Sequence, residues 1–242
     1  MNLRAISVIA VRPRFPDNIG SIARAMKNMG LHRLVIVNGC SPLHIHAYKL
    51  ASGAEELLER AEECSTLEEA IAEMGCVVGM TSRRGRERSP LLTPRVLAEK
   101  LASVSENNSI GLVFGPEREG LSNEELSLCH HFVKIPSCEP FPSLNLAQAV
   151  MILCYELFLT SGTVGDPVPA MAPSWQLERL FKHMEKTLIE IGFLDPGHPE
   201  RIMRVLRRLF GKSRLEEREV RILQGIWSQM DRQLKTRGRG RG

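Results

Sequence analysis

The sequence predicts an α/β protein built on a parallel β-sheet, and three observations support this fold class. Short runs of apolar and β-branched residues recur along the first two thirds of the chain. The runs are apolar throughout, as expected for parallel strands that are covered on both faces. Helical patterns separate them, which is the order of elements in a parallel α/β sheet. The predicted strands are Ile6–Val11, Arg33–Val37, Cys76–Met80, Ile110–Phe114 and Phe132–Ile135.

Capping residues mark where several of the intervening helices should begin, because their side chains accept hydrogen bonds from the first free backbone N–H groups. Asp17 and Asn18 are expected to cap a helix over Ile19–Met29. Two capping boxes are predicted, Thr66 with Glu69 and Ser122 with Glu125. Further helices are predicted over Pro94–Val104 and Leu144–Leu159.

The chain is expected to divide after a first domain that spans residues 1–160. Residues 161–174 are rich in Pro, Gly and Ser and predict a linker. Apolar residues then repeat at helical spacing in three stripes, which predicts a helical extension over residues 175–235 with Ser213 and Glu216 capping its last helix. The end, residues 236–242, repeats Arg and Gly and is expected to be a disordered basic tail.

The charge distribution indicates more than the net charge, which is only +4 over 242 residues. Residues 55–73 are acid-rich, whereas arginines crowd the extension. A local basic surface of this kind is typical of proteins that bind polyanions. The simpler interpretation is a solvated helix face. The cations concerned are Arg201, Arg204, Arg208, Lys235, Arg237, Arg239 and Arg241.

The six cysteines form no Cys-x-x-Cys pair and most lie in apolar surroundings, so reduced thiols and a cytoplasmic protein are expected. Cys129-His130-His131 and the pair His44 and His46 lack a visible third ligand, so no metal site is predicted. No apolar run reaches the ~18 residues of a membrane span. There is no Gly-x-Gly-x-x-Gly after a strand, and Leu121-Ser122 stands where a P-loop needs Lys-Ser/Thr.

Three segments carry the candidate chemistry. In the first, residues 16–30, the helix should turn Gly20, Arg24 and Lys27 away from the core, and glycine there would let a ligand backbone approach closely. The second, residues 112–125, is a buried strand that ends in a glycine-flanked loop, the kind of place where ligands bind in parallel sheets. The third, residues 135–150, leads from a strand through a proline-rich loop to an apolar helix that Ser143 could cap.

Taken together, the order and spacing of these segments resemble the SpoU/TrmH branch of the SPOUT methyltransferases. Asn18 and Arg24 match the first family motif, Gly115 and Glu117 the second, and Ser143-Leu144-Asn145 the third. The resemblance covers residues 4 to about 160. Within that branch, a helical extension after a Pro-rich linker is most similar to the TrmJ subfamily, which methylates the ribose of cytidine or uridine at tRNA position 32.

The resemblance implies a deep trefoil knot over about residues 81–159, a homodimer with the helix Leu144–Leu159 at its interface, and no metal. It also implies that S-adenosylmethionine is the cofactor. The catalytic set carried over is Arg24, Asn18, Glu117, Ser143 and Asn145. The cofactor set is Thr81, Ser82, Arg83, Gly115, Ile135, Pro142, Ser143 and Leu144.

The expected function is therefore 2′-O-methylation of a tRNA ribose. Arg24 is the residue most closely tied to ribose chemistry, and it could also reach a site that the second subunit completes. The alternatives are a ribosomal RNA substrate, a base methyltransferase of another SPOUT branch, and a non-catalytic RNA-binding module that keeps the fold.

Overall fold

The computed structural model describes residues 1–81, 90–140, 143–162, 168–211 and 213–239. Within these residues, seven strands form one sheet in the order β3-β2-β1-β6-β4-β7-β5, and every pairing is parallel. The α/β fold class predicted from the sequence is confirmed. The strands are β1 (Ile6–Val11), β2 (Arg33–Val37), β3 (Glu62–Cys64), β4 (Cys76–Met80), β5 (Leu91–Leu92), β6 (Ile110–Phe114) and β7 (His131–Val133).

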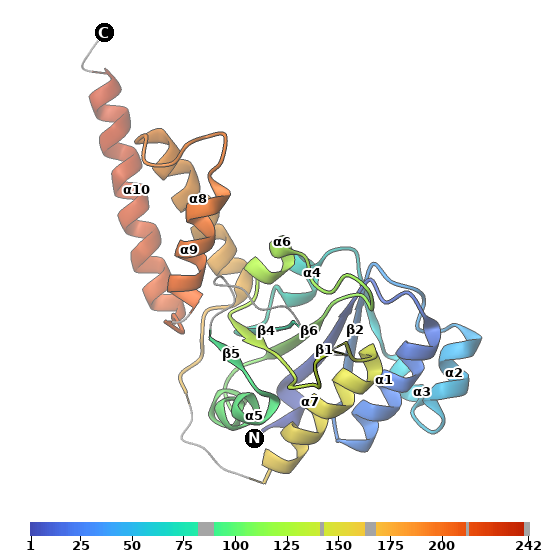
Figure 1. Ribbon diagram of the computed structural model, residues 1–242. Helices are drawn as coiled ribbons and strands as arrows, with labels where there is room; N and C mark the ends of the chain where they lie inside the picture. Colours follow the sequence, from blue (N-terminus) through green and yellow to red (C-terminus); the bar gives the residue numbers. More distant parts are fainter. Residues whose placement is uncertain (82–89, 141–142, 163–167, 212, 240–242) are drawn as a thin grey trace.

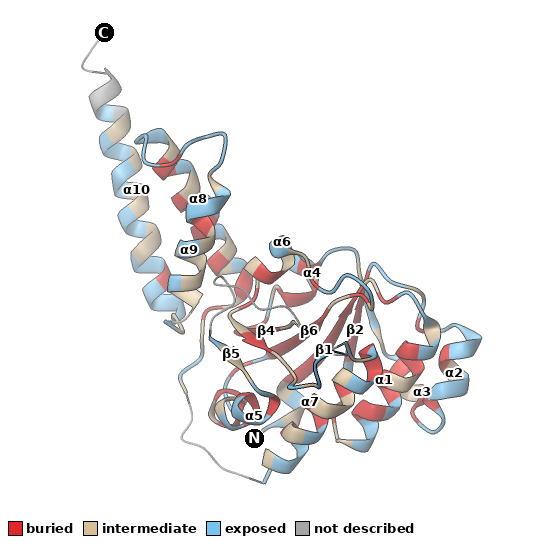
Figure 2. Ribbon diagram, viewed as in Figure 1, coloured by how far each residue is buried: buried red, intermediate tan, exposed pale blue. Residues whose placement is uncertain are grey.

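Helices cover both faces of the sheet, which makes three layers (Figure 1). One face packs against α1 (Pro16–Asn28), α2 (Ile45–Ala51), α3 (Glu55–Glu59), α5 (Pro94–Val104) and α7 (Leu146–Thr160). The other face packs against α4 (Leu67–Ile71) and α6 (Asn123–Ser127). A short 3-10 helix, Leu3–Ala5, precedes β1. Figure 2 shows the buried strands between these helices.

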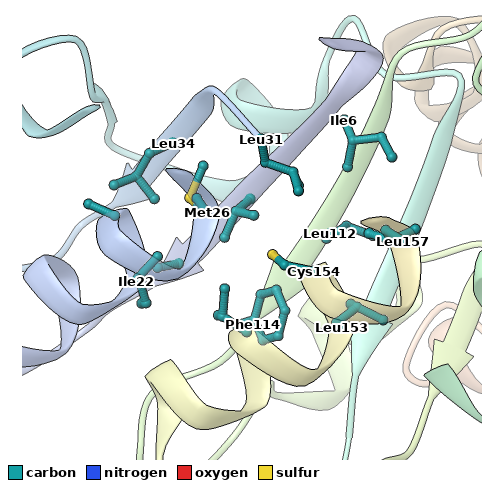
Figure 3. Packing of buried hydrophobic residues seen from close by; sticks show 14 of the residues in the cluster. Ile6, Ile22, Met26, Leu31, Leu34, Leu112, Phe114, Leu153, Cys154 and Leu157 are labelled. Carbon is teal, nitrogen blue, oxygen red and sulfur yellow. The ribbon is translucent and has the colours of Figure 1, made fainter. Parts of the chain in front are cut away.

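The larger core cluster lies where α1 and α7 pack against the central strands (Figure 3). Ile22 and Met26 of α1 meet Leu153 and Cys154 of α7 above Phe114 of β6, and all five side chains are buried. Burial of five side chains of this size supplies much of the free energy that holds α7 against the sheet. This packing fixes both helices whose first turns carry the candidate site.

The helix starts correct two predictions and agree with two others. Both capping boxes are present, at Thr66 and at Ser122. However, α1 begins at Pro16 with Phe15 as its N-cap, so Asn18 lies buried inside the first turn. Proline suits that first position because it has no N–H to leave unpaired. At α7 the N-cap is Asn145, whose Oδ1 accepts from two backbone N–H groups, and not Ser143.

The extension consists of α8 (Ser174–Glu190), α9 (Glu200–Gly211) and α10 (Glu217–Arg239), with its own small apolar core. The α10 helix extends past residue 235, where the sequence predicted its end, and Ser213 hydrogen-bonds to Leu209 instead of capping it. Figure 1 shows the three helices projecting from one side of the α/β domain. Among the described residues, no helix is both long and apolar enough to cross a membrane.

Side chains of the α/β domain hold the segment that leads into α8. The Asn108 amide accepts from the N–H of Met171 at 2.7 Å and donates to the carbonyl of Pro169 at 3.3 Å. Ser174 donates through its hydroxyl to the carbonyl of Met74 at 2.8 Å. The segment that the sequence predicted as a linker, residues 161–174, therefore has ordered contacts with the α/β domain over its described residues 168–174.

Candidate active site

A pocket opens at the carboxyl ends of three neighbouring strands, β6, β4 and β7. Thr81 follows β4, Gly115 follows β6 and Ile135 follows β7, and all three line the pocket. Ser143 and Leu144 close it from the side of α7. The space within the pocket and its open mouth is about 850 Å³. The sequence predicted a ligand site at this edge of the sheet.

The loop after β6 owes its shape to two glycines. A Cβ placed on Gly115 would lie 2.3 Å from the backbone nitrogen of Leu121, so only glycine lets the loop fold back on itself there. Gly120 has φ +66°, a left-handed conformation that glycine adopts without steric cost. The closed loop points Glu117 across the sheet toward the first turn of α1.

Three of the predicted catalytic side chains meet in one hydrogen-bonded chain. Asn18 donates through Nδ2 to Oε1 of Glu117 at 2.7 Å, and Asn145 donates through Nδ2 to Oδ1 of Asn18 at 2.9 Å. Glu117 also accepts from the backbone N–H of Arg14 at 3.3 Å. These residues are far apart in sequence, so the fold alone brings them together.

The direction of this chain is set at both ends. Oδ1 of Asn145 must face α7, because it accepts from the N–H groups of Ala147 and Gln148. Nδ2 of Asn145 therefore faces Asn18 and donates to its Oδ1. Because Oδ1 of Asn18 is held in this way, its Nδ2 points at Glu117. A carboxylate can only accept in this position. The result is a pre-oriented polar strip that connects the starts of α1 and α7 with the loop after β6.

The structure does not bring Arg24 into this group. Arg24 is exposed on α1, it does not line the pocket, and no described residue forms a hydrogen bond or an ion pair with it. Of the predicted cofactor residues, Ser82, Arg83 and Pro142 lie outside the described residues. The candidate catalytic set is thus divided among the polar strip, Ser143 at the pocket wall and a solvent-facing arginine.

The interpretation of Gly20 as an approach point for a ligand is wrong. A Cβ on Gly20 would lie 2.0 Å from the carbonyl oxygen of Ala47, so the glycine lets α1 and α2 pack backbone to backbone. Lys27, predicted on the same free face, forms an ion pair with Glu56 of α3 at 2.5 Å. Two short helices therefore contact the face that the sequence left open for a ligand at Gly20 and at Lys27, whereas Arg24 on the same face stays exposed.

Sequence reasoning also missed two ion pairs that join the loop after β1 to α6 and to the loop after β6. Arg12 forms a two-pronged pair with Glu125, which lowers the pKa of that carboxyl against the opposing effect of its burial. Arg14 pairs with Glu119 at 2.6 Å. The sequence did contain a signal for these ion pairs. Arginines follow the strand β1 closely, and acidic residues follow its neighbour in the sheet, β6. In the described part of the chain, no cluster of side chains is suited to a metal ion.

Both domains of the chain match known protein families. Residues 5–155 match the family described as the SpoU rRNA Methylase family, and residues 175–239 match the C-terminal domain of the tRNA methyltransferase TrmJ. The tRNA (cytidine/uridine/adenosine-2′-O-)-methyltransferase TrmJ of Pseudomonas aeruginosa is 42% identical over 93% of both chains. The tRNA (cytidine/uridine-2′-O-)-methyltransferase TrmJ of Salmonella typhimurium is 38% identical over 96% of this chain and 99% of its own.

Solved structures agree with the sequence relatives. The crystal structure of TrmJ from Z. mobilis superimposes with a TM-score of 0.83 at 34% identity and covers 93% of this chain and 98% of its own. A probable methylase family protein from Haemophilus influenzae has a TM-score of 0.65 at 33% identity, over 97% and 99% of the two chains. With the pocket, the polar strip and both domains accounted for, the chain belongs to the SpoU rRNA methylase family, in the branch that carries the TrmJ C-terminal domain.

Proposed function

We propose that this protein transfers a methyl group from S-adenosylmethionine to the ribose 2′-hydroxyl of cytidine or uridine at position 32 of tRNA. The observation that carries the proposal is the polar strip of Glu117, Asn18 and Asn145 beside the pocket, in a chain whose full-length relatives are named tRNA 2′-O-methyltransferases. The free cysteines of the described chain suit the reducing cytoplasm, where we expect the enzyme to act.

The pocket residues fit the cofactor by size and by chemistry. Leu144, Ile135 and Phe114 supply apolar walls for a purine, and the loop around Gly115 offers backbone polar groups at close range. When bound, the sulfonium supplies an activated methyl group, so the protein mainly has to orient the ribose and to stabilise the charge that develops on its oxygen. Ser82, Arg83 and Pro142 complete the proposed cofactor set.

Arg24 suits charge stabilisation better than proton abstraction. A guanidinium stays protonated in proteins, so it is a poor base. As a cation it can grip the phosphate next to the target ribose and stabilise the alkoxide that forms. Ser143, exposed at the pocket wall, and Asn145 are placed in this proposal to contact the ribose from the side of α7.

We further propose a homodimer in which Arg24 acts in the site of the other subunit. The support is the outer face of α7, where Tyr155, Phe158 and Leu159 are 47%, 46% and 54% exposed although the helix also has a buried apolar face. Large apolar side chains gathered on one exposed face are typical of interfaces. A dimer through α7 would explain why Arg24 has no described partner within one subunit.

The trefoil knot over about residues 81–159 is also part of the proposal. Its support is the path of the chain after β7, which leads past the loops after β4 and β6 to place α7 between α1 and α5. A crystal structure of the dimer would show both the threading and the interface.

The test is methyl transfer to defined RNAs. Purified protein is incubated with labelled S-adenosylmethionine and a tRNA transcript, and methylated nucleosides are mapped by mass spectrometry. We expect one 2′-O-methylated pyrimidine at position 32, and no product when that nucleotide alone is replaced by its 2′-deoxy form. A 2′-deoxy nucleotide at a neighbouring position is the control. Ribosomal RNA is the competing substrate, since the family description names it; product on ribosomal RNA alone would overturn the tRNA assignment.

A further inference from the structure

A second groove lies between the two domains, away from the pocket. Its walls are α6, the start of β7 and one side of α9. The groove and its mouth enclose about 810 Å³. None of the residues attributed above to the cofactor or to catalysis lines it.

The floor of this interdomain groove is apolar and its edge is open. Leu126, Cys129 and Phe132 form the floor and are 4%, 8% and 9% exposed. Burial raises the pKa of the Cys129 thiol, so its sulfur is uncharged at neutral pH. Val205 of α9 lies opposite and is 52% exposed. A flat ring could enter such a slot with its faces against carbon and its edge toward solvent.

One neutral donor, Nε2 of His130, opens to the slot or to the narrow cavity beside it. Nδ1 of His130 accepts from the backbone N–H of Val77 at 3.0 Å, which leaves the ring hydrogen on Nε2. Burial lowers the pKa of His130 to about 4, so the ring is uncharged at neutral pH. No described residue accepts from Nε2, yet no fully buried side-chain nitrogen of the described chain lacks a partner. Nε2 therefore has access to the groove or to the narrow cavity that adjoins it.

The charged side chains along the groove are all basic. Arg204 and Arg208 line it from α9, and none of its described lining residues carries a carboxylate. Arg207 also lines the groove, where it pairs with Glu178 and stacks over Phe181 at 4.6 Å. The edge of the groove is thus suited to an anionic group on a ligand whose flat ring occupies the slot.

Positive charge continues behind the groove. His130 and Gly211 also line the adjoining cavity, together with His131 and Arg214. Lys100 lies near Arg214, and the pKa of Lys100 is lowered, first by its burial and then by that guanidinium. Two cations held near each other at a domain junction favour a polyanion as the natural neighbour.

We infer that the interdomain groove binds one unpaired nucleotide of the RNA substrate, with its base in the apolar slot and its phosphate at Arg204 and Arg208. An apolar slot with one polar donor, next to two guanidinium groups, matches the way proteins hold splayed-out bases of single-stranded RNA. The inference rests on the proposed function, because it takes RNA as the substrate. It assigns a task to the junction that is separate from methyl transfer.

The test uses the full-length protein and two kinds of variant. Ser127→Trp fills the groove and leaves its charge, with Ser127→Ala as control for the lost hydroxyl contact to Glu124. Arg208→Gln removes a guanidinium, with Arg179→Gln as a control, because Arg179 is an exposed arginine of α8 that does not line the groove. We measure the Kd for tRNA at several salt concentrations and the binding of S-adenosylhomocysteine by calorimetry.

We expect Ser127→Trp to weaken tRNA binding by about tenfold or more, the lower range for loss of one stacked base. Arg208→Gln should lower the salt slope of log Kd by about one. Both controls should match wild type, and all four variants should bind S-adenosylhomocysteine normally. Photocrosslinking with thiouridine-substituted tRNA should give a crosslink to peptide 123–132 or 204–211 that Ser127→Trp loses.

Wild-type affinity and salt slope in both groove variants, or crosslinks that Ser127→Trp leaves unchanged, would overturn the inference. The inference would also be overturned if a protein partner occupied the groove and the affinity of the enzyme for tRNA stayed the same. If wild-type protein methylates no tRNA, the proposed function fails instead. If the wild-type protein methylates tRNA and the groove variants bind tRNA with normal affinity, the groove inference fails and the proposed function stands.

Discussion

Asn145 performs two tasks, and two substitutions at this position separate them. Its Oδ1 caps α7 through the N–H groups of Ala147 and Gln148, and its Nδ2 donates to Asn18. Asn145→Ala removes both contacts. Loss of an N-cap costs about 1 kcal/mol and loss of one partly buried hydrogen bond about another 1 kcal/mol. We therefore expect the free energy of unfolding to fall by about 2 kcal/mol, independently of pH.

Asn145→Asp keeps an acceptor for the helix N-terminus but replaces the donor to Asn18 with a second carboxylate oxygen. If Asn18 turned its amide to meet the new carboxylate, its own oxygen would face Glu117, so one repulsive contact remains in either orientation. Like charges that share a site raise the pKa of one carboxyl. Protonation restores a donor, so the stability deficit should shrink as pH is lowered from about 8 to about 5.

Urea unfolding across that pH range, followed by circular dichroism, measures both effects. Single-turnover methylation at saturating tRNA and cofactor measures the consequence for the site, and we expect a loss of about a hundredfold in both variants, the scale for a reacting group displaced by about 1 Å. A pH-independent deficit in Asn145→Asp would refute the assignment of Asn145 as donor and Asn18 as acceptor. Normal turnover in both variants would remove the polar strip from the mechanism.

Three further predictions follow from other residues. Arg24→Ala should lose roughly 2–4 kcal/mol of transition-state stabilisation and Arg24→Lys less, with cofactor affinity unchanged in both; an Arg24→Ala enzyme with near-normal single-turnover rates would return Arg24 to a solvated surface role. Gly20→Ala should destabilise the protein by roughly 1–3 kcal/mol despite the higher helix propensity of alanine, because its Cβ meets the Ala47 carbonyl. Gly225→Ala, where nothing lies within 4 Å of the added Cβ, should not destabilise, and thermal unfolding that ranked the two the other way would contradict the packing interpretation. Burial lowers the pKa of His131 to about 3, below the ~6.5 of an unfolded histidine, so the unfolded state takes up a proton first and stability falls as pH drops below about 6.5. His131→Gln should flatten that dependence in urea titrations, whereas the exposed His198→Gln should not; equal slopes would argue against a buried neutral His131.

The four central strands could be located from sequence because each is a nearly continuous run of apolar residues, interrupted only by Ser7 in β1 and preceded by Arg33 in β2. β1, β2, β4 and β6 have the predicted bounds. The edge strands β3 and β5 were missed, since a strand of three or two residues with one paired neighbour needs no apolar pattern. Residues 62–64 are Glu-Glu-Cys, which no periodicity argument assigns to a sheet.

The site was less accessible to pattern reasoning. The contact between Asn18 and Glu117 joins the first turn of α1 to the loop after β6, 99 residues away in sequence, and only the family resemblance pointed to both residues. Local rules misassigned Asn18 as a cap because Asn favours that position, whereas Pro16 already provides a start for α1. They misassigned Gly20 because an open helix face and a face covered by another helix look the same in one sequence.

The anchoring of the segment before α8 has a consequence for substrate choice. Asn108 and Ser174 fasten that segment to the α/β domain, so the extension does not swing on a free tether. The distance between the extension and the pocket is then fixed. For an RNA bound to the extension, its effective concentration at the pocket is set by this distance and not by the length of the intervening chain. An RNA that binds the extension and the pocket at once must have two contact sites separated by that distance. A folded stem and loop already holds such sites in place, so it loses little conformational entropy on binding. Inserting a flexible segment after Met171 would make the distance between the extension and the pocket variable, and selection among RNA substrates would weaken while the pocket itself stays intact.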